Sequence, residues 1–150
     1  MKKYTGKTST ALIPFPPNEI LLVKRDTVPF KDYWALPGGR MEPNEAIEQT
    51  IIREVKEETG LDVIIVRKIG EYVEAGVKDD VDYEYYPTCF LVKAIGGEIK
   101  RQESEIKEIQ LFNLKELPYP LAFEHEKMIK DYLNIVEYGI LGSDAFEKIR

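Results

Sequence analysis

The feature that most constrains the fold of this chain is a helical repeat with a termination signal at each end. Three aliphatic residues recur at i, i+4 and i+8, the spacing of one helix face: Ile47, Ile51 and Val55. Asn44 offers an N-cap before this repeat, and Gly60 offers the left-handed stop that commonly follows a helix. The pattern therefore predicts a helix over residues 45–59 that is anchored to the core by its apolar face.

The other side of this helix concentrates negative charge. Glu54, Glu57 and Glu58 are separated by three and four positions, so their carboxylates are expected to share one side. Like charges four residues apart destabilise an isolated helix by roughly a few tenths of a kcal/mol, so the arrangement calls for a cation. Carboxylate oxygens are hard ligands that favour Mg²⁺ or Mn²⁺ over Zn²⁺. We therefore expect a divalent-metal site on this face.

Two further features near the helix are suited to anionic ligands. The run ending in Gly38 and Gly39 is expected to pass from a strand into a loop whose backbone can approach a ligand and present a carbonyl oxygen. Arg25, at the end of EILLVKR, has a planar guanidinium suited to holding a phosphate through two hydrogen bonds. Its alternative interpretation is a solvated charge at a strand end.

The rest of the chain mixes strands with helices. Stretches rich in β-branched and aromatic residues predict strands near 8–14, 19–24, 63–73, 83–94 and 106–113. Proline and glycine interrupt them at Pro16-Pro17, Gly76, Gly96-Gly97 and Pro118.

A second helix is predicted near 121–134, and residues 135–150 could add a short third one. Its expected buried face consists of Leu121, Met128, Ile129, Tyr132 and Leu133. Strands mixed with helices indicate an α/β or α+β fold.

Composition narrows the function classes. A chain of 150 residues with 43% apolar content is expected to fold as one domain, 1–150. It has no apolar export signal and no window near the ~18 apolar residues of a membrane span, so we expect a cytoplasmic protein without a membrane partner. The net charge of −6 argues against nucleic-acid binding. The single cysteine, Cys89, excludes an internal disulfide and is expected to be buried.

The segment GRMEPNEAIEQTIIREVKEETGL, residues 39–61, resembles the Nudix box, G-x5-E-x7-R-E-U-x-E-E-x-G-U with U aliphatic, at every specified position. Such a match would arise by chance roughly once in ten million chains of this length. The flanking segments LLVKRD, PFKDYWALPGG and SEIKEIQLFNLKELP also resemble Nudix domains. The resemblance implies an α/β fold of the Nudix type, an α/β/α sandwich with a mixed central sheet.

The resemblance also implies roles for the residues of the box. Glu54, Glu57 and Glu58 would ligate Mg²⁺, with Mn²⁺ as a substitute, and the Gly39 carbonyl would assist. Arg53 would orient the carboxylates, a role that its i, i+4 spacing to Glu57 also fits.

Further positions complete the expected site. Gly38, Glu45 and Gly60 would support the loop and helix of the box. Nudix proteins often supply one more acidic group from outside the box; Glu103, Glu105 and Glu108 are the candidates here, and we favour Glu105. The general base that takes the proton of the attacking water is left open among Glu54, Glu57 and Glu105.

The substrate expected from the resemblance is a nucleoside diphosphate derivative. PFKDYWALPGG and the LAFEH stretch resemble compact Nudix proteins that hydrolyse ADP-ribose to AMP and ribose 5-phosphate, although many of those carry a proline where this chain has Gly76. The first alternative is a nucleotide-pool sanitiser that converts a nucleoside triphosphate to the monophosphate and pyrophosphate. A binding-only regulator is a further alternative, although the box is complete. Nudix enzymes of the ADP-ribose type are often homodimers.

Aromatic residues and the single histidine are less informative. Phe30, Tyr33, Tyr85 and Tyr86 could stack on a base, but aromatic residues near strands more commonly serve packing. For His125 we expect a surface or helix-packing role rather than catalysis.

Overall fold

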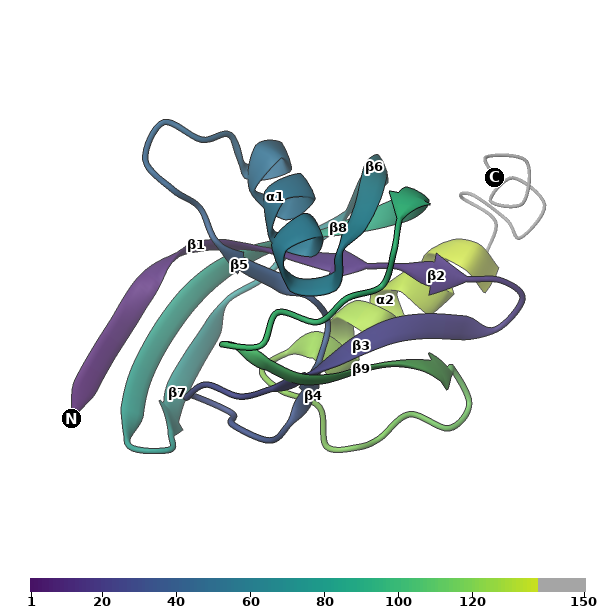
Figure 1. Ribbon diagram of the computed structural model, residues 1–150. Helices are drawn as coiled ribbons and strands as arrows, with labels where there is room; N and C mark the ends of the chain where they lie inside the picture. Colours follow the sequence, from purple (N-terminus) through teal and green to yellow (C-terminus); the bar gives the residue numbers. More distant parts are fainter. Residues whose placement is uncertain (138–150) are drawn as a thin grey trace.

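A computed structural model describes residues 1–137 of the chain (Figure 1). The strands are β1 (Lys2–Leu12), β2 (Pro14–Phe15), β3 (Glu19–Arg25), β4 (Trp34–Ala35), β5 (Gly38–Arg40), β6 (Leu61–Glu71), β7 (Glu74–Lys78), β8 (Val81–Gly97) and β9 (Ile106–Asn113). The helices are α1 (Ile47–Thr59) and α2 (His125–Glu137). No helix in this part of the chain is long and apolar enough to cross a membrane.

The strands form two sheets rather than one. The first is mixed and follows the order β5-β1-β8-β6, with β7 also pairing with β8. Strands β1 and β8 run parallel along their whole shared length, whereas β5, β6 and β7 pair antiparallel with their neighbours. The second sheet is antiparallel, with β3 pairing with β2, β4 and β9. The predicted α/β class with a mixed sheet is thus confirmed, with a second sheet added.

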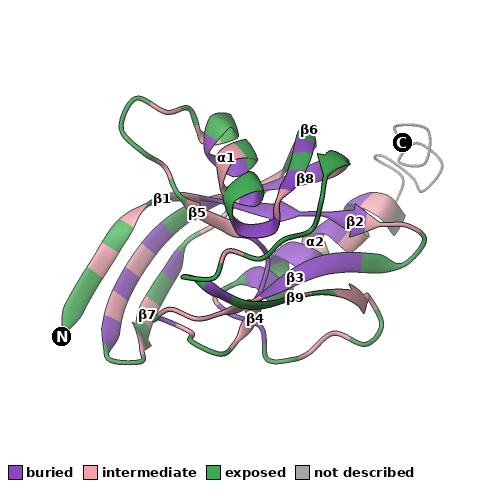
Figure 2. Cartoon of the chain, in the orientation of Figure 1, coloured by how far each residue is buried: buried purple, intermediate pink, exposed green. Residues whose placement is uncertain are grey.

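Strand alternation gives the described residues two large apolar cores, one under each helix (Figures 1 and 2), and a smaller third cluster lies around Tyr83 and Tyr85. In β3, Leu21 and Val23 pack in the core that contains Ile51 and Val55 of α1. The intervening Ile20 and Leu22 pack in the core that contains Met128, Ile129 and Tyr132 of α2. Because β1 and β8 alternate in the same way, the strands form a middle layer between α1 and α2.

The first helix differs from the prediction at its start. It begins at Ile47, its N-cap is Ala46, and Asn44 instead adopts a left-handed conformation with φ of 64° in the preceding loop. The side chain of Gln49 accepts a hydrogen bond from the Ala46 N–H at 2.8 Å, whereas Ala46 itself makes no side-chain cap hydrogen bond of the kind expected from Asn44. Gly60 ends the helix with φ of 82°, as predicted.

The second helix starts later than predicted, at His125, so Leu121 is buried just before it. Met128, Ile129 and Tyr132 form its buried face as expected, and Leu133 packs against them partly buried. Residues 135–137 continue this helix, and the rest of the predicted third helix lies outside the described residues. Cys89 is buried, as predicted.

The strand boundaries also differ from the predicted ones. Strand β1 begins at Lys2, well before residue 8, and β8 extends to Gly97. Gly76 was expected to mark a turn, but it lies inside β7, a strand that the sequence did not reveal. The turn is made instead by Asp79 and Asp80, whose φ values of 53° and 60° suit a tight hairpin between β7 and β8.

Candidate active site

A cavity of about 490 Å³ opens beside α1 and is lined by residues of both sheets and both helices. Its size lies within the range of roughly 300–1,000 Å³ that is usual for small-molecule sites. Acidic residues in its wall come from three separate parts of the fold, namely α1, β7 and the loop before β9: Glu54, Glu58, Glu74 and Glu105. Arg25 of β3 lines the same cavity, so the chamber contains both negative charge and a cation.

Glu58 is turned inward from the last turn of α1 and is only 5% exposed. Its Oε1 accepts a hydrogen bond from the Gly38 N–H at 2.8 Å, which ties the helix to the glycine loop. A Cβ at Gly38 would lie 2.1 Å from the Ser9 carbonyl oxygen, so the loop can approach β1 only with glycine here. Burial, and then the nearby Glu54, raise the pKa of the Glu58 carboxyl well above its ordinary value.

Glu54 lies against Gly39 on the cavity side of α1. A Cβ at Gly39 would stand 2.3 Å from the Glu54 carboxyl carbon, so glycine leaves the space that this carboxylate occupies. Burial raises the pKa of Glu54 to about 7, even though Arg53 donates a hydrogen bond to its Oε1 at 2.9 Å. Glu54 and Glu58 are therefore two adjacent carboxylates in a partly dehydrated wall, where each disfavours the charge of the other.

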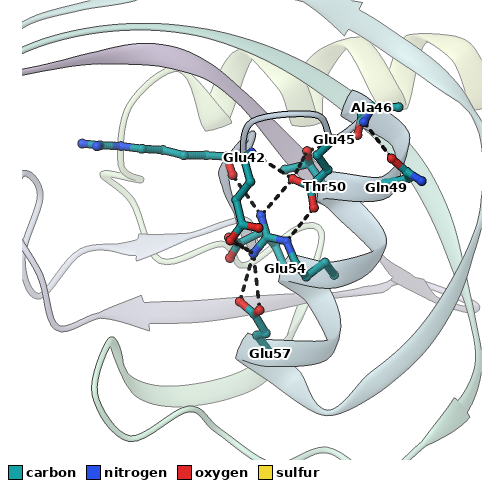
Figure 3. A network of polar contacts seen from close by, with 9 residues as sticks. Glu42, Glu45, Ala46, Gln49, Thr50, Glu54 and Glu57 are labelled. Carbon is teal, nitrogen blue, oxygen red and sulfur yellow. Dashed lines mark hydrogen bonds and ion pairs between the residues drawn. The ribbon is translucent and has the colours of Figure 1, made fainter.

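Arg53 donates hydrogen bonds to several carboxylates at once. Figure 3 shows three of these acids, Glu45, Glu54 and Glu57, gathered on and before α1. The Nε and Nη2 of Arg53 donate to the two oxygens of Glu45 at 2.7 and 3.1 Å, and Nη2 also donates to the Arg40 carbonyl at 3.0 Å. Its Nη1 donates to Glu54 and, at 3.2 and 3.3 Å, to both oxygens of Glu57. The guanidinium thus joins the loop before α1 to two turns of the helix.

The loop that carries Glu105 is fastened to the C-terminal end of α1. The Lys100 N–H donates to the Thr59 carbonyl at 2.8 Å, and the Gln102 N–H donates to the Glu58 carbonyl at 3.2 Å. The carbonyl of Glu105 accepts from the Asp26 N–H at 2.8 Å, just beyond β3. These contacts hold Glu105 at the cavity edge although the residue is 50 positions away from Val55 in the sequence.

Two arginines, Arg25 and Arg40, line the cavity, and Arg25 has no carboxylate partner among the described residues. Arg25 donates from Nε to the Pro29 carbonyl at 3.0 Å and packs its guanidinium over the Phe123 ring at 5.0 Å. Within residues 1–137, no carboxylate lies within ion-pair distance of it. Burial lowers the pKa of Arg25, and the charge of Glu58 partly offsets that effect. A guanidinium that is partly buried and unpaired in this way is suited to an anionic ligand.

The chemistry of the donor set fits a divalent cation. Glu58 has no side-chain cation within ion-pair distance among the described residues, and Glu54 has only the guanidinium that it shares with Glu45 and Glu57. A hard dication would relieve the repulsion between Glu54 and Glu58. No three His, Cys, Asp or Glu side chains in residues 1–137 are already gathered closely enough to hold one.

Comparison with known families gives an independent assignment. The model of the NUDIX domain matches residues 6–132, a span that contains α1, the glycine loop and most of both sheets. The chain belongs to the Nudix family. Its box helix and preceding loop are the two elements that form the carboxylate wall of the cavity.

Two Nudix relatives illustrate the range of this family. The chain is 43% identical over 116 residues to an ADP-ribose pyrophosphatase of Methanocaldococcus jannaschii, covering 77% of this chain and 66% of that protein. It is 30% identical over 125 residues to an 8-oxo-dGDP phosphatase of Mus musculus, covering 81% of this chain and 35% of that protein. The chain therefore spans less than two thirds of either relative.

A solved structure agrees with the fold. It is a bifunctional NMN adenylyltransferase/ADP ribose pyrophosphatase of Francisella tularensis in complex with AMP and a Mn ion. The two chains are 27% identical, with a TM-score of 0.65, over 87% of this chain and 41% of that one. The mixed sheet with two helices is thus the fold of a Nudix domain.

The structure separates the three box carboxylates that were expected to share one side. Glu54 and Glu58 line the cavity, whereas Glu57 lies on the outer surface with its side chain 46% exposed and held by Arg53. The difference arises because Glu58 is drawn inward by the Gly38 N–H while Glu57 is drawn back toward Arg53. The simple helical spacing did not distinguish these two directions.

Of the acids considered outside the Nudix box, Glu105 lines the cavity. Glu108 lies on β9, where it pairs with Lys24 at 3.6 Å on the surface, and Glu103 is exposed. The alternative interpretation of Arg25 as a solvated strand-end charge is wrong, because it lies partly buried in the cavity.

His125 is also not a surface residue. It is 5% exposed, it lines the cavity, and its Nδ1 accepts a hydrogen bond from the Leu36 N–H at 3.0 Å. This contact packs the start of α2 against the residue that follows β4, so the helix-packing role is correct but incomplete.

Sequence reasoning missed two parts of the cavity wall. Glu74 was overlooked because the strand that carries it, β7, was not predicted, and the residue is 4% exposed. Arg40 packs over the rings of Tyr4 and Tyr85 and donates to the Tyr85 hydroxyl at 3.1 Å. The parallel pairing of β1 with β8, which places Tyr4 opposite Tyr83, brings this group together and leaves no short-range signal in the sequence.

Proposed function

We propose that this Nudix chain uses a divalent cation to hydrolyse the pyrophosphate bond of ADP-ribose, giving AMP and ribose 5-phosphate. The cation would be Mg²⁺, with Mn²⁺ as a substitute. The observation that carries the proposal is that one cavity is lined by Glu54, Glu58 and Arg25, and that Arg25 has no carboxylate partner within residues 1–137. A pyrophosphate is the kind of group that can be held between a guanidinium and a carboxylate-bound cation.

The residues that would hold the cation are Glu54 and Glu58, with Glu57 and the Gly39 carbonyl. Bound there, the cation would neutralise phosphate charge and lower the pKa of a water molecule. Because Arg53 occupies both oxygens of Glu57, this carboxylate would exchange its contact with Arg53 for the cation. Arg53 would remain anchored through its two hydrogen bonds to Glu45.

The remaining steps belong to side chains of this chain. Arg25 would hold one phosphate in orientation by donating through Nη1, since Nε bonds to Pro29 and Nη2 makes longer contacts of 3.4 Å with Thr27. A carboxylate must take the proton of the attacking water, and Glu54 and Glu105 both line the cavity from which that water would attack. Glu105 is the more exposed of the two, so it can pass the proton on to solvent.

The choice of ADP-ribose rests on similarity to the archaeal ADP-ribose pyrophosphatase and on a cavity large enough for more than a phosphate. The second candidate, sanitation of damaged nucleotides, is favoured by the similarity to the 8-oxo-dGDP phosphatase. Both functions would use the same carboxylate wall, so they differ only in what the rest of the cavity accepts. Assembly as a homodimer is part of the proposal.

The test is a substrate panel. Purified protein is incubated with ADP-ribose, NADH, dinucleoside polyphosphates and nucleoside triphosphates and diphosphates, with Mg²⁺, with Mn²⁺ and with EDTA. We expect AMP and ribose 5-phosphate from ADP-ribose at the highest kcat/KM, and no reaction in EDTA. Preferential formation of a monophosphate from one damaged nucleotide would favour sanitation, and no turnover of any compound would contradict hydrolysis altogether.

A further inference from the structure

The wall of the cavity contains a buried acid that is not part of the Nudix box. Glu74 begins β7, is 4% exposed, and accepts a hydrogen bond at Oε2 from the Glu124 N–H at 3.1 Å. Its other oxygen, Oε1, has no hydrogen-bond donor among the described residues, and yet it is not sealed off. The side-chain atoms of this region that are both sealed and unpartnered are Ser9 Oγ and Gln102 Oε1. Oε1 of Glu74 is therefore open to the cavity.

Beside Glu74, His125 presents a hydrogen-bond donor of fixed position. Burial lowers the pKa of His125 to about 3, so the ring is neutral. Because Nδ1 accepts from the Leu36 N–H, the ring hydrogen is on Nε2. Nε2 has no acceptor at hydrogen-bond distance in residues 1–137, and it too is absent from the sealed atoms. The imidazole therefore offers a donor to whatever occupies the cavity.

The two groups are spaced for a ligand between them. His125 Nε2 and Glu74 Oε2 are 3.8 Å apart, which is too far for a hydrogen bond. One oxygen atom placed between them could accept from Nε2–H and donate to the carboxyl group. A hydroxyl group both accepts and donates, so it satisfies both neighbours at once.

The position of Arg25 indicates which hydroxyl group this is. Arg25 lines the same cavity as Glu58 and Glu74, and the charges of both carboxylates act on its guanidinium, so Arg25 is near both of them. A phosphate on Arg25 would have its own sugar directly beyond it, whereas a base would be one sugar ring further away. The Phe123 ring, which lies 5.5 Å from the His125 ring, supplies an apolar surface for the carbon face of that sugar.

We propose that Glu74 and His125 bind a hydroxyl group of a ribose that is attached to the pyrophosphate, and so select ribosylated substrates. The inference rests on the proposed function for the presence of a pyrophosphate in the cavity. Burial also raises the pKa of Glu74 to about 7. The carboxyl group is therefore poised between donor and acceptor forms, and either form can bond to a hydroxyl group.

The test compares ADP-ribose with its two monodeoxy analogues, each lacking the 2-hydroxyl of one ribose. Dissociation constants are measured in EDTA by calorimetry for wild type, Glu74→Gln and His125→Asn, and kcat and KM are measured with Mg²⁺. Glu71→Gln is the matched control, because the one ion pair of that exposed acid within residues 1–137 is with Lys68. His125→Asn retains an acceptor for the Leu36 N–H while removing the Nε2 donor.

We expect wild type to prefer ADP-ribose to one of the analogues by about tenfold or more, the value of one hydrogen bond to a charged group. Glu74→Gln and His125→Asn should remove that preference by weakening ADP-ribose binding, while the analogue binds as before. Glu71→Gln should behave as wild type. Thermal melts establish that each variant is folded.

The inference would be overturned if wild type did not distinguish ADP-ribose from either analogue, or if the folded variants kept the preference. It would also be overturned if the variants instead lost a preference for ADP-ribose over the analogue in which hypoxanthine replaces adenine. The last result would show that the pair reads the base. Absence of turnover with the binding pattern intact would overturn the proposed hydrolysis and leave the assignment of Glu74 and His125 standing.

Discussion

Gly39 and Glu54 fit each other closely: a Cβ on the glycine would lie 2.3 Å from the carboxyl carbon and 2.5 Å from each carboxyl oxygen of the glutamate. The position of this carboxylate in the cavity therefore depends on the absence of a side chain 15 residues earlier in the chain. Gly39 therefore has a second role besides its proposed carbonyl ligand: it leaves the space in which the carboxylate of the box helix lies.

Gly39→Ala should consequently displace Glu54 and lower kcat/KM by about 100-fold, since misplacement of a catalytic group by about 1 Å can cost that much. Stability should change little, because the clash is with the far end of a side chain that can move aside. Gly96→Ala is the control, because a Cβ there meets its nearest neighbour at 3.5 Å, an ordinary contact. Steady-state kinetics and thermal melts of both variants provide the comparison. A Gly39→Ala protein with wild-type kinetics would show that Glu54 is not needed where it lies.

The Arg53 network predicts how stability depends on pH. Hydrogen bonds from Arg53 are the main cause that lowers the pKa of Glu45 from 4.5 to about 2. A carboxyl group with a lowered pKa in the folded state stabilises the protein above its unfolded pKa, and that contribution is lost as the pH falls toward the folded pKa. The melting temperature of wild type should therefore fall between about pH 4.5 and pH 2 more steeply than that of Arg53→Met.

The control for this comparison is Arg101→Met, because Arg101 donates to the Ile106 carbonyl rather than to a carboxylate. Its pH profile should run parallel to wild type. Thermal melts are recorded in EDTA, so that metal binding does not contribute. Parallel profiles for wild type and Arg53→Met would contradict the role assigned to the Arg53–Glu45 contact.

Glu57→Gln tests the proposed metal set. The substitution preserves volume and removes a charged oxygen ligand, so we expect an unchanged fold and turnover lower by about 100-fold or more. Glu48→Gln changes an exposed acid in the first turn of the same helix and should have no effect. Circular dichroism and kcat as a function of Mg²⁺ concentration are the measurements. Retained turnover with an unaltered Mg²⁺ requirement would remove Glu57 from the site.

The sequence was sufficient to predict the box helix because the information there is local. The aliphatic spacing, the Gly60 stop and the box residues all lie within one segment of the chain, and α1 forms where they indicate. The direction of each box carboxylate was less predictable, because Glu58 is turned by a hydrogen bond from Gly38 and Glu57 by Arg53. Such contacts depend on how the loop folds back and not on helical periodicity.

The meeting of Glu74 and His125 in the cavity wall could not be predicted for a related reason. Glu74 lies in a short strand that contains Gly76, a residue that usually interrupts a strand. His125 reaches Leu36 across 89 positions of sequence. These residues meet only because β8 pairs with β7 on one edge while α2 covers the opposite face from α1, which is a tertiary arrangement.

Substitutions of two consecutive cations can distinguish a phosphate contact inside the cavity from a charge on the surface. Arg25 and Lys24 are consecutive, yet Arg25 lines the cavity and Lys24 pairs with Glu108 on the surface at 3.6 Å. Arg25→Met keeps most of the side-chain volume and the contact with Phe123, but it removes the donor proposed for phosphate. The KM for ADP-ribose should rise about tenfold to a hundredfold, since a hydrogen bond between charged groups is lost.

Lys24→Met removes the same charge one residue earlier and should leave KM within about twofold of wild type at moderate salt, because exposed ion pairs contribute little. If both variants raised KM equally, the effect would be a general loss of positive charge near the cavity and not a contact with phosphate. An Arg25→Met variant that lowers kcat at constant KM would instead show that Arg25 stabilises the phosphate only in the transition state. Steady-state kinetics at two salt concentrations distinguish these outcomes, since only the general charge effect is screened by salt.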